Sequence, residues 1–341
     1  MLIKLHRREL YTSSISAAVV APLFVDPEPR VLIGLDNGII LVKDVQFRPT
    51  THPSLEVKGG AILSLYPCDI AMFGSTSLIS GDSDGLVSVF SDNELFADVT
   101  LDTPILAVTV SPNGTGEKRI VCGDSQGTVT LYVPTQMGAM LRRTSLKAIT
   151  AGLTPSTLPL TISPAVSHIV PIVGPSQAAC VLVADTFGRL HLFVVEPWEH
   201  VQTWRAPCPI GAIGTFPSDK MKHCHDVQSS CLVACDDGHI YHFDCCQGTF
   251  HSFAHLAYQI TSLSILPGAH LADDRNWQVA VGGVFPGFYI LTQKGEQTHF
   301  PLGDNVFSLS WTLRQRSRLD RIWLLAATED NDVCLFDVSD L

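Results

Sequence analysis

Acidic side chains recur at one kind of place in this sequence, inside short polar segments that end in glycine. Carboxylates gathered in this way could work as an acid and base pair or bind calcium. Calcium loops need D-x-D-x-D-G spacing, which the chain lacks. An aspartate in a tight turn bonds to its own backbone, so we expect these residues to shape turns. They are Asp36, Asp82, Asp84, Asp124, Asp185, Asp236 and Asp237.

A run of cysteines and histidines between positions 223 and 246 carries the sulfur and imidazole groups that bind zinc. The run has no C-x-x-C pair, and several members alternate along expected strands, which sends their side chains to opposite faces. We expect no metal or other cofactor, although the sequence leaves zinc open for this segment. Its members are His223, Cys224, His225, Cys231, Cys235, His239, His242, Cys245 and Cys246.

The chain has neither a G-x-S-x-G nucleophile turn nor a G-x-x-x-x-G-K-[ST] phosphate loop. Strand histidines such as His168, His191 and His242 could meet aspartates in a central channel, but a single strand histidine is more often packed than catalytic. The sequence predicts a protein that is not an enzyme and takes no small-molecule substrate, with a channel-centred enzyme as the weaker alternative.

Composition narrows the function classes further. The 341 residues are 46% hydrophobic and 16% charged, which predicts a folded chain with a large core. Lys and Arg number 22 against 33 Asp and Glu, and the net charge of −11 argues against nucleic acid as a partner. Charges near the N-terminus argue against a secretory signal, and no apolar run is long enough to cross a membrane. We expect a cytoplasmic protein without membrane insertion, whose ten cysteines are free thiols.

One short pattern recurs along the whole chain: an apolar strand, a polar turn that ends in glycine, and an alternating strand. Residues 78–85 followed by 86–90 show it, and residues 120–127 followed by 128–132 show it again. A tight hairpin requires positive φ, which glycine adopts freely and asparagine tolerates best among the other residues. The expected turn residues are Gly38, Gly85, Gly127, Gly188, Gly238, Gly287 and Asn331.

The spacing of these turns predicts the fold. Successive turn residues lie 47, 42, 61, 50, 49 and 44 positions apart, which is typical of β-propeller blades. A strand rich in small residues precedes each hairpin and a polar strand follows it. We therefore predict an all-β, seven-bladed β-propeller with four antiparallel strands per blade. Residues 1–341 would form one domain, with the N-terminal strand at 2–10 completing the last blade and closing the ring.

The two faces of this ring are expected to differ in charge. The loops between first and second strands hold nine of the 22 basic residues, whereas the opposite rim carries the turn aspartates. Unequal faces can orient a protein partner by electrostatic complementarity, and solvated loop charges are the alternative interpretation. The candidate docking residues are Lys118, Arg119, Lys220, Lys222, Arg275, Arg314, Arg316, Arg318 and Arg321.

The hairpins also carry a family resemblance. Their form, apolar-apolar-x-Gly-Asp-x-x-Gly, together with residues 112–123, resembles the FG-GAP repeats of integrin-alpha-type propellers. The repeats lack the Gly-His and Trp-Asp dipeptides of ordinary WD40 blades. In the FG-GAP family the glycine-rich loop carries aspartates for calcium, and this chain lacks them, so the resemblance implies no metal here.

Within that group, residues 279–295, 303–309 and 324–328 resemble two intracellular propellers. The first is the FG-GAP repeat-containing subunit of the KICSTOR complex, which implies a scaffold for a GTPase-activating complex in TORC1 nutrient signalling at the lysosome. The second is the propeller of a subunit of the Bardet–Biedl syndrome complex (BBSome), which implies a ciliary coat. The sequence ends with its propeller, which favours the first. We thus expect a non-catalytic scaffold whose partners are protein subunits and recruit it to lysosomal or ciliary membranes, with a generic WD40-like adaptor as a further alternative.

Overall fold

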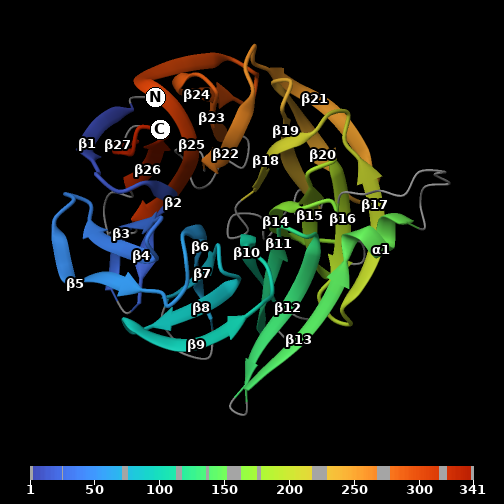
Figure 1. Cartoon of the computed structure of the whole chain (residues 1–341). Coiled ribbons are helices and arrows are strands. Elements are labelled where there is room, and N and C mark those ends of the chain that lie inside the picture. The colour runs from blue at the N-terminus through green and yellow to red at the C-terminus, as the bar shows by residue number, and fades with distance from the viewer. Residues whose placement is uncertain are drawn as a thin grey trace.

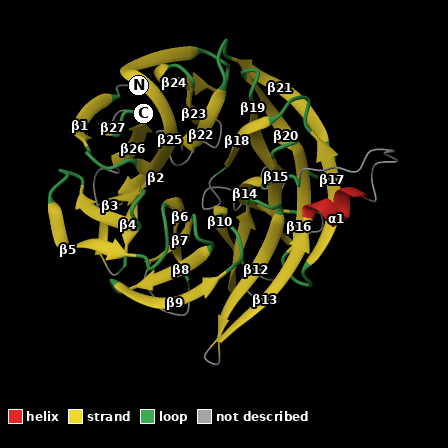
Figure 2. Cartoon of the chain, viewed as in Figure 1, coloured by secondary structure: helices red, strands yellow, loops and turns green. Residues whose placement is uncertain are grey.

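The computed structural model describes residues 3–24, 26–70, 76–112, 117–135, 138–151, 163–174, 178–216, 229–266, 277–314 and 321–338. In this part the chain forms 27 strands and one short helix, α1 (Leu146–Ala151). Figure 2 shows how far strands dominate the described chain. The prediction of an all-β protein is confirmed. No helix among the described residues has the length and apolar character needed to cross a membrane.

Five sheets have four strands each, and every neighbouring pair of strands is antiparallel. They are β2–β5 (Ile15–Leu23, Asp26–Leu35, Ile39–Asp44, Pro49–Glu56), β6–β9 (Ile62–Asp69, Thr76–Asp82, Leu86–Ser91, Glu94–Thr100), β10–β13 (Ile105–Pro112, Lys118–Asp124, Thr128–Thr135, Gly138–Ser145), β14–β17 (Val166–Val173, Ala179–Asp185, Arg189–Val194, Glu199–Arg205) and β18–β21 (Ile210–Thr215, Ser230–Cys235, His239–Asp244, Thr249–His255).

The remaining strands form one seven-stranded sheet in the order β1-β27-β26-β25-β24-β23-β22. Their bounds are β22 (Ile260–Leu266), β23 (Gln278–Gly283), β24 (Pro286–Thr292), β25 (Gln297–Arg314), β26 (Arg321–Thr328), β27 (Asp332–Asp337) and β1 (Lys4–Leu10). The long strand β25 pairs with β24 through residues 297–305 and with β26 through residues 306–314. It therefore belongs to two successive groups of strands.

The sheets are arranged like the blades of a propeller around a common centre (Figure 1). The first strand of each sheet lies next to the first strand of the following sheet, beginning with β2 beside β6 and β6 beside β10. β25 lies next to β2, and β1 pairs with β27, so that Leu10 is opposite Asp332. Segments from the two ends of the chain thus share one sheet.

Hydrophobic clusters fill the spaces between neighbouring sheets, which explains the apolar runs of the second strands. Val233 of β19 packs into the cluster shared with β14–β17, whereas the adjacent Leu232 packs into the cluster shared with β22 and β23. Successive side chains of a strand point to opposite faces, so a strand covered on both faces must be apolar throughout. All six residues of β19 are buried accordingly.

The residues at the hairpin turns adopt left-handed backbone conformations. Gly38, Gly85, Gly127, Gly188, Gly238 and Asn331 have φ between 63° and 86°. Gly85 shows why a side chain is excluded there, because an added Cβ would lie 2.2 Å from the carbonyl oxygen of Leu101. Gly287 has a φ of 108°, but it lies inside β24 at a register shift rather than at the end of the turn.

Candidate protein-docking face

The turn carboxylates are used by the turns themselves. Asp82 Oδ1 accepts hydrogen bonds from the backbone N–H groups of Asp84 (2.9 Å) and Leu86 (2.8 Å). Asp124 and Asp185 make the same pair of bonds in their own turns. Burial raises the pKa of Asp82, although the N–H donors oppose this shift. These three carboxylates are structural groups at separate turns.

Next to one of these turns lies a buried polar network that is not evident from the sequence. His191 Nε2 lies 3.2 Å from Asp185 Oδ2, and His191 Nδ1 lies 2.9 Å from Thr203 Oγ1. The side chains of Asp185 and His191 are fully buried. The network joins β15, β16 and β17 within one sheet, and its burial leaves no access for a substrate.

The histidines considered for a catalytic channel do not come together. His168 lies on β14 and His191 on β16, whereas His239 and His242 lie on β20 of the following sheet. Burial lowers the pKa of His168 to about 4, so this imidazole is neutral at physiological pH. The described residues thus contain no converging pair of histidine and aspartate on the inner strands.

The described cysteines of the cysteine-rich segment, apart from the exposed Cys246, also pack as core. Cys231 and Cys235 lie on β19, and burial raises the pKa of Cys235 to about 12, which keeps the thiol protonated. His223, Cys224 and His225 lie outside the described residues. Within the ranges that the structure describes, no three His, Cys, Asp or Glu side chains gather in a way that could hold a metal ion.

Four of the nine candidate docking residues lie on described strands. Lys118 and Arg119 begin β11, and the Arg119 guanidinium pairs with Glu117 at 2.6 Å. Arg314 and Arg321 face each other in register at the end of β25 and the start of β26. The structure thus brings Arg314 and Arg321 together. The other five, Lys220, Lys222, Arg275, Arg316 and Arg318, lie outside the described residues.

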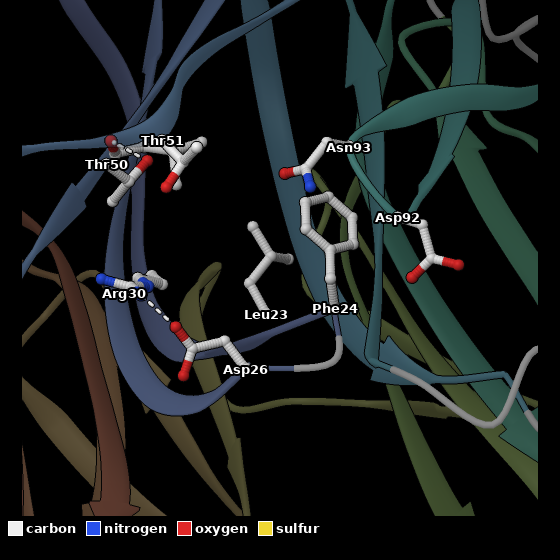
Figure 3. A pocket seen from close by; sticks show the side chains of 9 residues that line it. Leu23, Phe24, Asp26, Arg30, Thr50, Thr51, Asp92 and Asn93 are labelled. Atoms are coloured by element: carbon white, nitrogen blue, oxygen red, sulfur yellow. Dashed lines mark hydrogen bonds and ion pairs between the residues drawn. The ribbon is translucent and has the colours of Figure 1, made fainter.

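A pocket of about 360 Å³ opens between the first two sheets (Figure 3). Leu23, Phe24 and Asp26 enter it from the connection of β2 and β3, and Asp92 and Asn93 enter it from the turn between β8 and β9. Because the β2–β3 connection is a first-to-second strand connection like the one before Lys118, the pocket opens on the face predicted to carry the basic loops.

A backbone hydrogen bond and an ion pair hold the walls of this pocket in place. The backbone N–H of Phe24 donates to the Thr76 carbonyl at 2.7 Å, which ties the β2–β3 connection to the second sheet. Arg30 forms an ion pair with Asp26 at one side of the pocket, as Figure 3 shows. Leu23, Phe24 and Val42 supply apolar surface, and Thr50, Thr51 and Asn93 supply polar groups. The pocket therefore offers both apolar and polar groups to a side chain of a partner.

A second pocket, of about 550 Å³, lies between β1 and the turn that joins β4 to β5. Two of its basic lining residues form ion pairs within the protein, Arg8 with Asp332 and Arg48 with Asp44. Sequence reasoning missed both pockets. Each is formed by segments of two sheets, and only the arrangement of the sheets brings those segments together.

Comparison with known proteins adds evidence on the fold. No protein-family model matches the sequence, and a search of curated proteins finds no match. The chain is similar in structure to BBS1N in two crystal structures of its complex with ARL6DN, one soaked with mercury and one with lead. The TM-scores are 0.70 and 0.72 at 13% and 11% identity, and each alignment covers 99% of this chain and 97% of the other. At this identity the match shows a common fold.

Proposed function

We propose that this protein is a non-catalytic scaffold that binds other protein subunits through a β-propeller. The observation that carries the proposal is the match over nearly the whole chain to BBS1N, which was crystallised in complex with ARL6DN. The turn carboxylates, buried histidines and buried thiols described above serve the fold, which supports a binding role over an enzymatic one.

The proposal includes the number of blades, the single domain and the closure of the ring. We assign seven blades, with the seven-stranded sheet divided into two blades at β25, and residues 1–341 as one domain. β1 would complete the last blade and close the ring, which removes an exposed sheet edge. The backbone N–H of Tyr11 donates to the Asn331 carbonyl at 3.0 Å, which supports a fixed junction between the two ends.

The face that bears the first-to-second strand connections is the proposed docking face. This face would present the basic loops and the pocket at Phe24. The ends of these loops that the structure describes carry Lys118, Arg119, Arg314 and Arg321. A partner with an acidic patch and one protruding side chain fits such a face. We propose the same docking role for the five basic residues outside the described ranges, Lys220, Lys222, Arg275, Arg316 and Arg318.

The comparisons favour the BBSome-like alternative over the KICSTOR-like interpretation that the sequence favoured. Both matched structures contain BBS1N, and neither FG-GAP membership nor a role in nutrient signalling receives support. We accordingly propose a subunit of a BBSome-like assembly, located in the cytoplasm and brought to ciliary membranes by its partners.

The direct test measures binding of the purified full-length chain to purified ARL6 of the same organism by titration calorimetry. The double variant Arg314→Glu, Arg321→Glu is expected to weaken binding about tenfold, because it reverses two charges on the docking face. Lys58→Glu, in the exposed connection before β6 on the opposite face, is the matched control and should leave affinity unchanged. Absence of binding by the unaltered chain, or equal losses in both variants, would contradict the assignment.

A further inference from the structure

Exposed apolar side chains gather on the face opposite the proposed docking face. This face carries the turns between second and third strands and the connections between successive sheets. The turns that contain Asn37, Asp84, Gln126 and Asp330 have polar tips, as hairpin turns usually do. By contrast, Phe187 in the β15–β16 turn and Val284 in the β23–β24 turn are 36% and 48% exposed.

These side chains belong to three consecutive sheets. An added Cβ at Gly188 would lie 2.8 Å from the Cys208 carbonyl oxygen, so the Phe187 turn lies against the connection at 207–209. The N–H of Asp236 donates to the carbonyl of Pro209 at 2.9 Å, which joins the next turn to the same connection.

The strip continues through the connection before β22. The N–H of Val284 donates to the carbonyl of Gln259 at 2.9 Å, and the rings of Tyr258 and Phe285 lie 5.3 Å apart. Tyr258 is 46% exposed, and the two prolines of the earlier connection are exposed as well. We call this strip the apolar arc, and its residues are Phe187, Pro207, Pro209, Tyr258 and Val284.

Two carboxylates lie in the middle of the apolar arc. Asp237 is exposed, and its carboxylate accepts hydrogen bonds from the Cys208 thiol (2.9 Å) and the His239 N–H (3.1 Å). Partial burial opposes ionisation, but these donors and the His239 imidazole, whose Nδ1 lies 3.1 Å from Asp237 Oδ2, outweigh it and lower the pKa of Asp237, so the group is negative. The positive charge of Arg189 lies at the Phe187 end, where its guanidinium carbon is 5.9 Å from the ring centroid.

We propose that the apolar arc binds a segment of a partner protein in which apolar side chains flank a lysine or arginine. Rigid aromatic side chains such as Phe187 and Tyr258 are effective anchors, since little side-chain entropy is lost when they are covered. The cation of the segment would lie opposite Asp236 and Asp237, where the electrostatic attraction is complementary. A second copy of the chain fits less well, because each copy carries a net charge of −11.

This inference rests on the proposed role in protein binding but concerns the other face of the molecule. A propeller that binds one partner at its basic loops and a second at the apolar arc could hold two proteins at once. The two interactions can be tested separately, because the residues involved do not overlap.

The test selects binders to the immobilised full-length chain from a library of short random peptides. Fluorescence anisotropy then measures the affinity of the selected peptides. The expected consensus has apolar residues around a Lys or Arg. Tyr258→Ser is expected to weaken binding about tenfold, and Asp236→Asn several-fold. Asn37→Ser and Gln126→Ser, on polar turns of the same face, are matched controls and should bind as the unaltered chain does.

Asn37, Gln126 and Tyr258 are exposed, and Asp236 is half-buried in a turn, so thermal melting should show each variant to be folded. The proposal would be overturned if no peptide is enriched, if the consensus is acidic, or if Tyr258→Ser leaves peptide binding unchanged. A dimer in light scattering that Tyr258→Ser dissociates would also overturn it, because the occupant would then be a second copy. If the Tyr258→Ser variant still binds ARL6, then failure of the peptide experiment leaves the proposed function standing.

Discussion

His168 shows how a single side chain couples this fold to pH. The side chain is partly buried on β14, and its Nδ1 atom is shielded from solvent without a hydrogen-bond partner. Burial lowers its pKa to about 4 in the folded protein, below the ordinary value of 6.5. The unfolded chain therefore takes up a proton first as pH falls, and the contribution of this group to stability is lost from about pH 6.5 down to about pH 4.

The corresponding prediction concerns the variant His168→Gln. Between about pH 7 and pH 5, the unaltered chain should lose about 2 kcal/mol more of its free energy of unfolding than the variant loses. Urea unfolding at the two pH values measures both losses. Equal losses would show that His168 has a nearly ordinary pKa in the folded protein.

At the scale of elements, Asn331 joins the last hairpin to the first sheet. Its φ of 63° is the conformation that glycine adopts at the equivalent turns, which is why asparagine could be predicted there. The structure adds that Asn331 Oδ1 accepts a hydrogen bond from the N–H of Ile15 at 2.9 Å. The side chain thus connects residues 316 positions apart in the sequence.

Asn331→Gly is accordingly expected to destabilise the protein, although glycine is the usual residue at this turn. The variant gains backbone freedom at positive φ but leaves the N–H of the buried Ile15 without a partner, for a net loss of about 1 kcal/mol in urea unfolding. Asn331→Asp keeps the oxygen acceptor and is the control, which should retain more stability than the glycine variant. A glycine variant as stable as the unaltered chain would show that this hydrogen bond contributes nothing.

The distinction between local patterns and contacts between distant segments explains what the sequence could predict. Strands and turns follow local patterns, so the two-residue alternation of β16 and the Asp-x-x-Gly turn after β11 were sufficient to predict the hairpins. Contacts that depend on register were not predictable, as the His191–Thr203 pair across β16 and β17 shows. The pocket at Phe24 was missed for a similar reason, because the bridge from Phe24 to Thr76 crosses between sheets.

At the scale of the whole molecule, the chain combines a rigid frame with two unlike faces. Interlocked hydrophobic clusters between sheets and the shared sheet of β1 and β27 hold the frame. One face has the Phe24 pocket and the ends of the basic loops, and the other has the apolar arc with Asp236 and Asp237 in its middle. These two unlike faces are the features on which the proposed scaffold role depends.

The most direct test of this account is purification of the tagged full-length chain from its own cells, followed by mass spectrometry of the proteins that remain bound. The account predicts stoichiometric recovery of other subunits, with BBSome-like coat proteins among them. Recovery of the chain alone, as a stable monomer, would contradict the claim that this propeller is a scaffold.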